Sequence, residues 1–177
     1  MPTGVYSTDG TSATGVTVSW FEVVGASGYT VYRNTVNNPD AAEVVSSVSA
    51  VSFEDTTALP GMLYFYWVAA TNAVSASAKS AVETGFRAIP APDGVAATND
   101  SGAEAVTVSW QPVEGAAYYR IYRGTKSGED FAVEIDTTTE TSYADLSGAA
   151  GKTYYYSVTA VGASSESGFS AFVAGKR

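Results

Sequence analysis

The 177-residue sequence contains neither histidine nor cysteine, so the usual general base and the thiolate nucleophile are both missing. The remaining options for catalysis are a serine with a lysine, or a pair of carboxylates. Two such pairs are adjacent in the sequence, Glu54-Asp55 and Glu129-Asp130. Neighbouring residues on an extended strand point to opposite faces. A glycosidase, in contrast, needs two carboxylates about 5–9.5 Å apart across one cleft. We therefore expect no catalytic residues, and the sequence predicts that the protein is not an enzyme.

Oxygen ligands for a metal ion are concentrated in three turn-like segments: Asp9-Gly10-Thr11, Asn37-Asn38-Pro39-Asp40 and Asn99-Asp100-Ser101-Gly102. None has the spacing of an EF-hand loop, and Asn, Asp and Gly are also the usual turn formers. The missing cysteine and histidine exclude the common zinc sites. We expect no metal and no cofactor. A calcium ion where the Asp9 loop meets the second half of the chain is the remaining alternative.

Aromatic residues in segment 63–71 offer another kind of chemistry, binding through exposed rings. Alternation there points every second residue toward a core, which leaves Phe65 and Trp67 facing outward. Tyr32, on a neighbouring expected strand, would share that face. We expect Tyr32, Phe65 and Trp67 to form an exposed cluster that binds a polysaccharide or a surface protein. The alternative is that these rings only cover their own sheet, with arginine stems lying across them.

The acidic charge balance excludes several partners. The chain has 18 Asp and Glu against 9 Lys and Arg, a net charge of −9. Nucleic acids and anionic membrane surfaces attract basic proteins, so we expect neither as a partner. No apolar stretch is long enough to span a bilayer, so we expect no membrane insertion, and we expect a monomer. For Arg33 and Arg123 we expect exposed local salt bridges at the rim of each domain rather than anion sites.

Two copies of one sequence unit make up the chain. When the two halves are aligned without a gap, Trp20 matches Trp110, and about 33 of the 86 aligned residues are identical. Trp67, however, aligns with Ser157, so the expected aromatic cluster is reduced in the second copy. The repeat predicts domains at residues 1–88 and 89–177.

The junction between the copies spans residues 87–92 and contains two prolines, which favour a stiff linker. The second copy ends where the first does, at an arginine. We therefore expect the chain to be part of a longer array of such units.

Each copy has the pattern of seven short strands separated by turn residues. The apolar residues are dominated by valine and tyrosine, which favour strands. Alternation is clearest in Val16, Val18 and Trp20, and turn residues such as Pro60-Gly61 separate the strands. The pattern predicts an all-β fold, a seven-stranded β-sandwich in each copy. In the first copy we expect strands at 5–8, 16–21, 29–34, 43–47, 51–55, 63–71 and 80–86.

Each copy resembles a fibronectin type III domain. The core tryptophan of that family corresponds to Trp20 and Trp110. Its tyrosine corner corresponds to Pro60-Gly61-Met62-Leu63-Tyr64, and to Ala150-Gly151-Lys152-Thr153-Tyr154 in the second copy, where proline is lost. The resemblance implies two tandem immunoglobulin-like sandwiches. It also implies that each tyrosine hydroxyl bonds back to the upstream backbone. We expect a structural core built on Trp20, Tyr64, Trp110 and Tyr154.

The resemblance is to tandem repeats of large secreted or surface bacterial proteins. It implies a non-catalytic spacer or presentation module, secreted or at the cell surface, whose partners are neighbouring domains of a parent polypeptide. The alternative is a carbohydrate- or protein-binding module that uses the aromatic cluster of the first domain.

Overall fold

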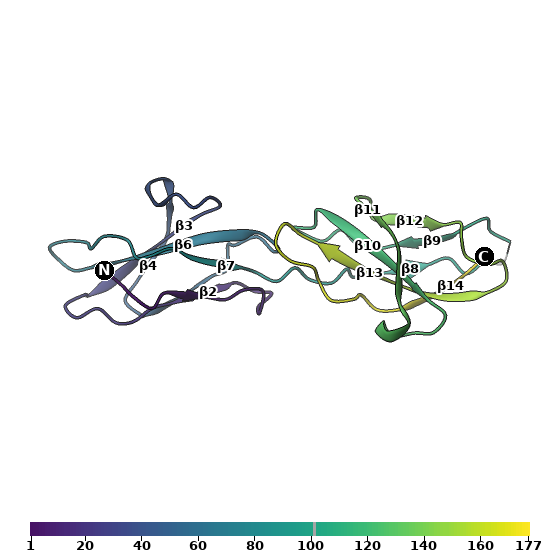
Figure 1. Cartoon of the computed structure of the whole chain (residues 1–177), viewed down its shortest axis with the longest axis horizontal. Helices are drawn as coiled ribbons and strands as arrows, with labels where there is room; N and C mark the ends of the chain where they lie inside the picture. The colour runs from purple at the N-terminus through teal and green to yellow at the C-terminus, as the bar shows by residue number, and fades with distance from the viewer. Residues whose placement is uncertain (101) are drawn as a thin grey trace. The chain divides into compact units, whose positions relative to one another are not determined.

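The computed structural model describes residues 1–100 and 102–177, and the chain divides into two compact units, Met1–Ala88 (unit 1) and Ile89–Arg177 (unit 2). Both units consist of short antiparallel strands joined by turns (Figure 1). Each contains a short 3-10 helix, Pro39–Ala41 in unit 1 and Glu129–Phe131 in unit 2. The predicted all-β fold class is confirmed. Among the described residues, no helix is long and apolar enough to cross a membrane.

Unit 1 has two sheets whose facing side chains form one core. The smaller sheet has the strand order β1-β2-β5, and the larger has the order β4-β3-β6-β7. The strands are β1 (Tyr6–Ser7), β2 (Val16–Ser19), β3 (Gly28–Asn34), β4 (Glu43–Val48), β5 (Ser52–Asp55), β6 (Leu63–Thr71) and β7 (Glu83–Phe86).

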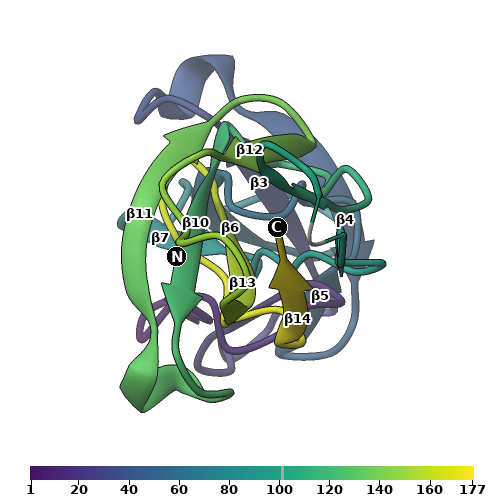
Figure 2. The ribbon, with the colours of Figure 1, turned by 90° about the vertical axis from the view of Figure 1, so that its right-hand side faces the viewer.

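Unit 2 repeats this arrangement, with sheets β8-β9-β12 and β11-β10-β13-β14 (Figure 1). Figure 2 shows the four strands of the larger sheet, β11, β10, β13 and β14, in that order across the view. Its strands are β8 (Ala96–Ala97), β9 (Val106–Ser109), β10 (Tyr118–Gly124), β11 (Val133–Thr138), β12 (Ser142–Asp145), β13 (Thr153–Val161) and β14 (Val173–Lys176). In both units the third strand changes register against its edge partner, between Val31 and Tyr32 and between Ile121 and Tyr122. The two units therefore share even the irregularities of their sheets.

The core of each unit lies between its two sheets. Val16 and Val18 of β2 are fully buried, and Trp20, just after this strand, is 4% exposed. The ring of Trp20 packs 5.2 Å from that of Tyr29 on the opposite sheet. Trp110, also 4% exposed, packs at the same distance from Tyr119 in unit 2. In each unit, this packing of aromatic side chains joins the two sheets of the sandwich.

The second residue of the sixth strand of each unit is a tyrosine whose hydroxyl is bonded to the preceding turn. Tyr64 Oη accepts a hydrogen bond from the Leu59 N–H at 3.3 Å, and Tyr154 Oη accepts one from the Ala149 N–H at 3.2 Å. Both turns contain a glycine in the left-handed region, with φ +68° at Gly61 and +77° at Gly151. The glycine and the tyrosine are thus the residues that this turn requires, and unit 2 forms it without the proline.

Strand β7 begins at Glu83, later than the strand predicted from residue 80. Just before it, the hydroxyl oxygens of Ser77 and Ser80 accept hydrogen bonds from the N–H groups of Ala70 and Val68, each at 3.0 Å. Side-chain oxygens therefore replace some of the backbone acceptors, and residues 77–80 follow β6 without forming a regular ladder. The alternation of apolar and polar residues in this part of the sequence does not indicate that serine hydroxyls replace backbone acceptors.

Candidate functional site

The aromatic cluster predicted in unit 1 is the first candidate site. On the larger sheet, Tyr32 lies directly opposite Trp67, and Asn34 lies opposite Phe65. Tyr32, Phe65 and Trp67 thus share the outer face of this sheet, the face turned away from the core residues Val31 and Tyr66.

The expectation that Trp67 is exposed is wrong, because only 2% of its surface is accessible. Tyr32 and Phe65 are half-buried. The segment after β6 explains part of this burial: it turns back along the strand, and Lys79 Nζ lies 4.2 Å from the centre of the Tyr32 ring. Trp67 is therefore a packing residue, and the surface left in unit 1 has no exposed tryptophan that a ligand could reach.

In unit 2 the corresponding face carries a different aromatic group. Ser157 stands where unit 1 has Trp67, and Phe169 stands where unit 1 has Lys79. The Phe169 ring packs edge-on against the Tyr122 ring, with the ring centroids 4.7 Å apart. The centroid of the Phe172 ring lies 5.8 Å from that of Phe169. All three rings are half-buried. Sequence reasoning missed Phe169 and Phe172, although aligning the two copies placed Phe169 at the Lys79 position.

An ion network lies beside these rings. Arg120 on β10 contacts Glu134 Oε2 at 3.0 Å and Glu166 Oε2 at 3.6 Å. Thr159 Oγ1 and Tyr122 Oη donate hydrogen bonds to Glu166 Oε1 at 2.6 and 3.3 Å. Hydrogen bonds to the Tyr118 hydroxyl and to Glu134 raise the pKa of Arg120, so the guanidinium is charged at every accessible pH. This network fixes polar groups at the edge of the aromatic surface.

Each unit also contains a buried carboxylate that is paired with an arginine. Asp55 is fully buried, and its Oδ2 accepts hydrogen bonds from Arg33 at 2.6 Å and from the Tyr66 hydroxyl at 2.9 Å. Its Oδ1 accepts bonds from the backbone N–H and the hydroxyl of Thr57. The Arg33 guanidinium in turn lies 4.5 Å from the centre of the Tyr64 ring.

Unit 2 repeats this network, with Arg123 at 2.7 Å and the Tyr156 hydroxyl at 2.8 Å from Asp145 Oδ2. Arg33 and Arg123 therefore form local ion pairs, but the expectation of exposed pairs at the rim is wrong, because both carboxylates are buried in the interior. Burial alone raises the pKa of a carboxyl group, but hydrogen bonds from Ser147, Tyr156 and Arg123 outweigh it and lower the pKa of Asp145 to about 2. Both oxygens of each carboxylate are engaged by the protein, so the network stabilises the fold and offers no free acid or base.

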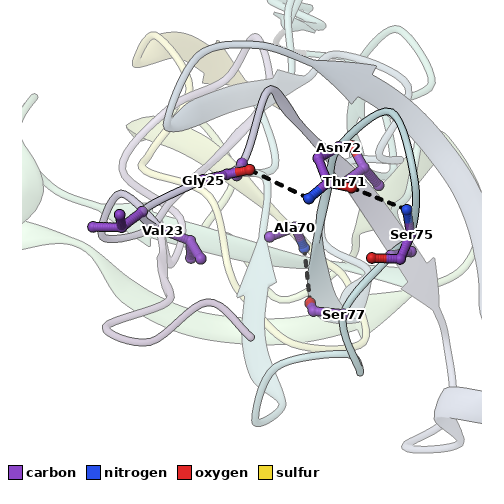
Figure 3. Close-up of a pocket in the computed structure, with 10 residues that line it drawn as sticks. Val23, Gly25, Ala70, Thr71, Asn72, Ser75 and Ser77 are labelled. Atoms are coloured by element: carbon purple, nitrogen blue, oxygen red, sulfur yellow. Dashed lines mark hydrogen bonds between the residues drawn. The ribbon is translucent and has the colours of Figure 1, made fainter.

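A shallow recess lies at one end of unit 1, between the β2–β3 loop and the β6–β7 loop (Figure 3). Its volume is about 160 Å³. Asn72 crosses it, donating from Nδ2 to the Gly25 carbonyl at 3.4 Å and from its backbone N–H to the Ser75 carbonyl at 3.0 Å. The lining contains no ionisable side chain. The recess therefore lacks any group for acid–base catalysis.

Among residues 1–100 and 102–177, no three or more Asp, Glu, His or Cys side chains converge in a way that would hold a metal ion. The candidate loop at Asn99-Asp100-Ser101-Gly102 includes Ser101, which lies outside the described residues. In the described part of that loop, Asp100 Oδ1 accepts a hydrogen bond from the Gly102 N–H at 2.9 Å, as in an ordinary turn.

Comparison with known proteins identifies the fold. No family model matches the chain. Two curated relatives, both named amylopullulanase, match part of it. The protein from Thermoanaerobacterium saccharolyticum is 30% identical over 84 residues, and the one from Thermoanaerobacterium thermosulfurigenes is 33% identical over 69 residues. These matches cover 48% and 39% of this chain but only 6% and 4% of the relatives' own lengths.

Among solved structures, a segment of two fibronectin type III domains from chicken tenascin aligns over 99% of both chains, with a TM-score of 0.72 and 19% sequence identity. The chain therefore has the fold of two tandem fibronectin type III domains, as the sequence resemblance implied.

Proposed function

We propose that the chain is a non-catalytic module that separates or presents other domains of a larger secreted or cell-surface bacterial protein. The observation that carries this proposal is that each unit completes its own core and its own buried ion network. The likeness to a small part of two much longer bacterial enzymes supports a place beside other domains. Those neighbouring domains are the partners that we propose.

The linker supports the spacer role. The Ala88 N–H donates a hydrogen bond to the Ser12 carbonyl in unit 1, while the next side chain, Ile89, is 4% exposed and belongs to the core of unit 2. Pro90 follows and restricts its own φ angle. Little free chain is therefore available to act as a flexible tether.

The test is a distance measurement across the intact chain. Because the sequence has no cysteine, Thr3→Cys and Lys176→Cys provide specific sites for a fluorescent donor and acceptor. A spacer should give a narrow distribution of transfer efficiencies. Replacing the exposed residues Pro90 and Ala91 by glycine should broaden it without changing the thermal stability of either unit. A broad distribution in the unaltered linker would contradict the spacer role.

The lack of catalysis is tested separately. Incubation of the chain with pullulan, starch and cellulose should release no reducing sugar above the level of a heat-denatured sample. Release of sugar that scales with protein concentration would show that the fold hides an active site.

The alternative, ligand binding through Tyr32, Phe65 and Trp67, is not favoured. Its main residue, Trp67, is packed into the fold and is out of reach.

A further inference from the structure

The two units differ most informatively on the outer faces of their larger sheets. Core positions are kept: Trp20 and Trp110, and the buried Asp55 and Asp145, occupy equivalent places. We define the outer face of unit 2 by Tyr118, Arg120, Tyr122, Glu166, Phe169 and Phe172. The equivalent residues of unit 1 are Gly28, Thr30, Tyr32, Ala76, Lys79 and Val82. Of the six positions only the tyrosine is shared, and at the other five unit 2 has the larger side chain.

Stability does not require these larger side chains, because unit 1 has the same fold without them. Phe169 covers its sheet where unit 1 uses Trp67, but the core of unit 2 includes none of Tyr118, Arg120 and Phe172. Partly exposed aromatic rings of this kind offer flat, apolar surfaces beside polar tips. The divergence at Tyr118, Arg120 and Phe172 is therefore best explained by contact with something outside the unit.

The polar groups are held in place and remain within reach of solvent. The side chains of Arg120, Glu134 and Glu166 are 34%, 39% and 36% exposed. Arg120 is fixed by two carboxylates and by the Tyr118 hydroxyl at 3.4 Å. The guanidinium carries five N–H donors and each carboxylate can accept several bonds, so the network keeps capacity for further hydrogen bonds.

The chemistry of this surface favours one class of ligand. A protein partner would have to dehydrate an ion network at the centre of its contact, which is costly. Nucleic acids and acidic polymers would meet two carboxylates against one guanidinium, in a protein of net charge −9. A neutral sugar chain offers apolar ring faces to the aromatic residues and hydroxyl groups to the network, which can stay partly hydrated.

We propose that the outer face of unit 2, centred on Tyr122, Phe169 and Arg120, binds a neutral polysaccharide chain. The open surface suits an extended polymer rather than an enclosed small molecule. The proposal goes beyond the spacer role and does not depend on it: a rigid spacer can lack the binding face, and a flexible module can have it.

The experiment is affinity electrophoresis of the intact chain in gels containing pullulan, amylopectin, xylan or hydroxyethylcellulose, with polygalacturonate as an acidic control. We expect at least one neutral polymer to slow migration and polygalacturonate to have no such effect. Phe169→Lys with Phe172→Ala removes two of the rings and should weaken retardation at least about tenfold. Lys79→Ala, at the equivalent site of unit 1, should leave retardation unchanged.

Arg120→Thr places the unit 1 residue at an exposed position and serves as a second variant that does not disturb the core. It should weaken binding while the thermal unfolding of unit 2 changes little. The proposal is overturned if no neutral polymer retards the chain, if only the acidic polymer does, or if folded variants at Phe169 and Arg120 bind as strongly as the original protein.

Discussion

At Asp145, burial and hydrogen bonding act on the pKa of one carboxyl group in opposite directions. Burial raises it, and the bonds from Ser147, Tyr156 and Arg123 lower it further than burial raises it, to about 2 from an ordinary 3.8. A carboxyl group with a lowered pKa in the folded state stabilises the fold when it is ionised. Its contribution is complete above the unfolded pKa and is lost as the pH falls through the folded pKa.

We therefore predict that unit 2 loses about 2 kcal/mol of stability between about pH 4 and pH 2 through this group. Urea unfolding monitored by circular dichroism over that range measures the change. Asp145→Asn should remove this part of the pH dependence and should also lower the stability of unit 2 at pH 7 by about 3 kcal/mol, because Arg123 loses its partner.

Glu140→Gln is the matched control, since Glu140 is exposed in the same unit. It should leave both the stability at pH 7 and the acid dependence nearly unchanged. An equal acid dependence in the Asp145→Asn protein would show that other carboxyl groups cause the loss.

Trp67 shows the limit of sequence reasoning at the residue scale. Alternation correctly placed it on the face opposite the core residue Tyr66. Whether that face is covered depends on residues 72–82. This segment has no regular strand structure, and it runs back along β6, to which its backbone is hydrogen-bonded. A period-2 pattern gives the face to which a side chain points, and it carries no information about what later lies over that face.

At the scale of elements, the two units place a large side chain on different elements: on strand β6 in unit 1, and on the segment after the sixth strand in unit 2. Unit 1 combines Trp67 on the strand with Lys79 on the segment, whereas unit 2 combines Ser157 with Phe169. Lys79 and Phe169 both lie against the equivalent tyrosine, Tyr32 or Tyr122, so the large group moves from one element to the other. The sheet stays covered in both cases.

We predict that Trp67→Ser destabilises unit 1 by about 3–5 kcal/mol, because a buried indole is removed. Adding Lys79→Phe should recover at least about 1 kcal/mol, whereas Lys79→Phe alone should gain little because Trp67 already fills the space. Urea unfolding of the four proteins in this cycle measures the coupling. Additive effects would mean that the two positions do not compensate each other.

The elements themselves were largely predictable from the sequence. Strands β2 to β6 of unit 1 lie within one or two residues of the expected ranges, because their alternation and turn residues agree. Strand β7 differs because the Oγ of Ser80 and of Ser77 take the place of backbone acceptors. The aromatic group of unit 2 was missed because Phe169 lies in the equivalent irregular segment of unit 2, between β13 and β14.

At the scale of the whole molecule, the two buried clusters share no residue. One is built around Trp20 and the other around Trp110, and each contains its own pair of core tyrosines from the sixth strand of its unit. Cooperative unfolding depends on contacts within a core, so units with separate cores are expected to unfold separately. This separation is what a module placed between other domains requires.

We predict that Trp110→Ala lowers the unfolding free energy of unit 2 by about 3–5 kcal/mol and leaves unit 1 unchanged. Trp20→Ala should do the reverse, and it is the matched control because the two tryptophans are equally buried. Differential scanning calorimetry of the intact chain resolves the result as the movement of one transition while the other stays in place. If either substitution lowers both transition temperatures together, the two units do not unfold independently, and the stability of each depends on the other.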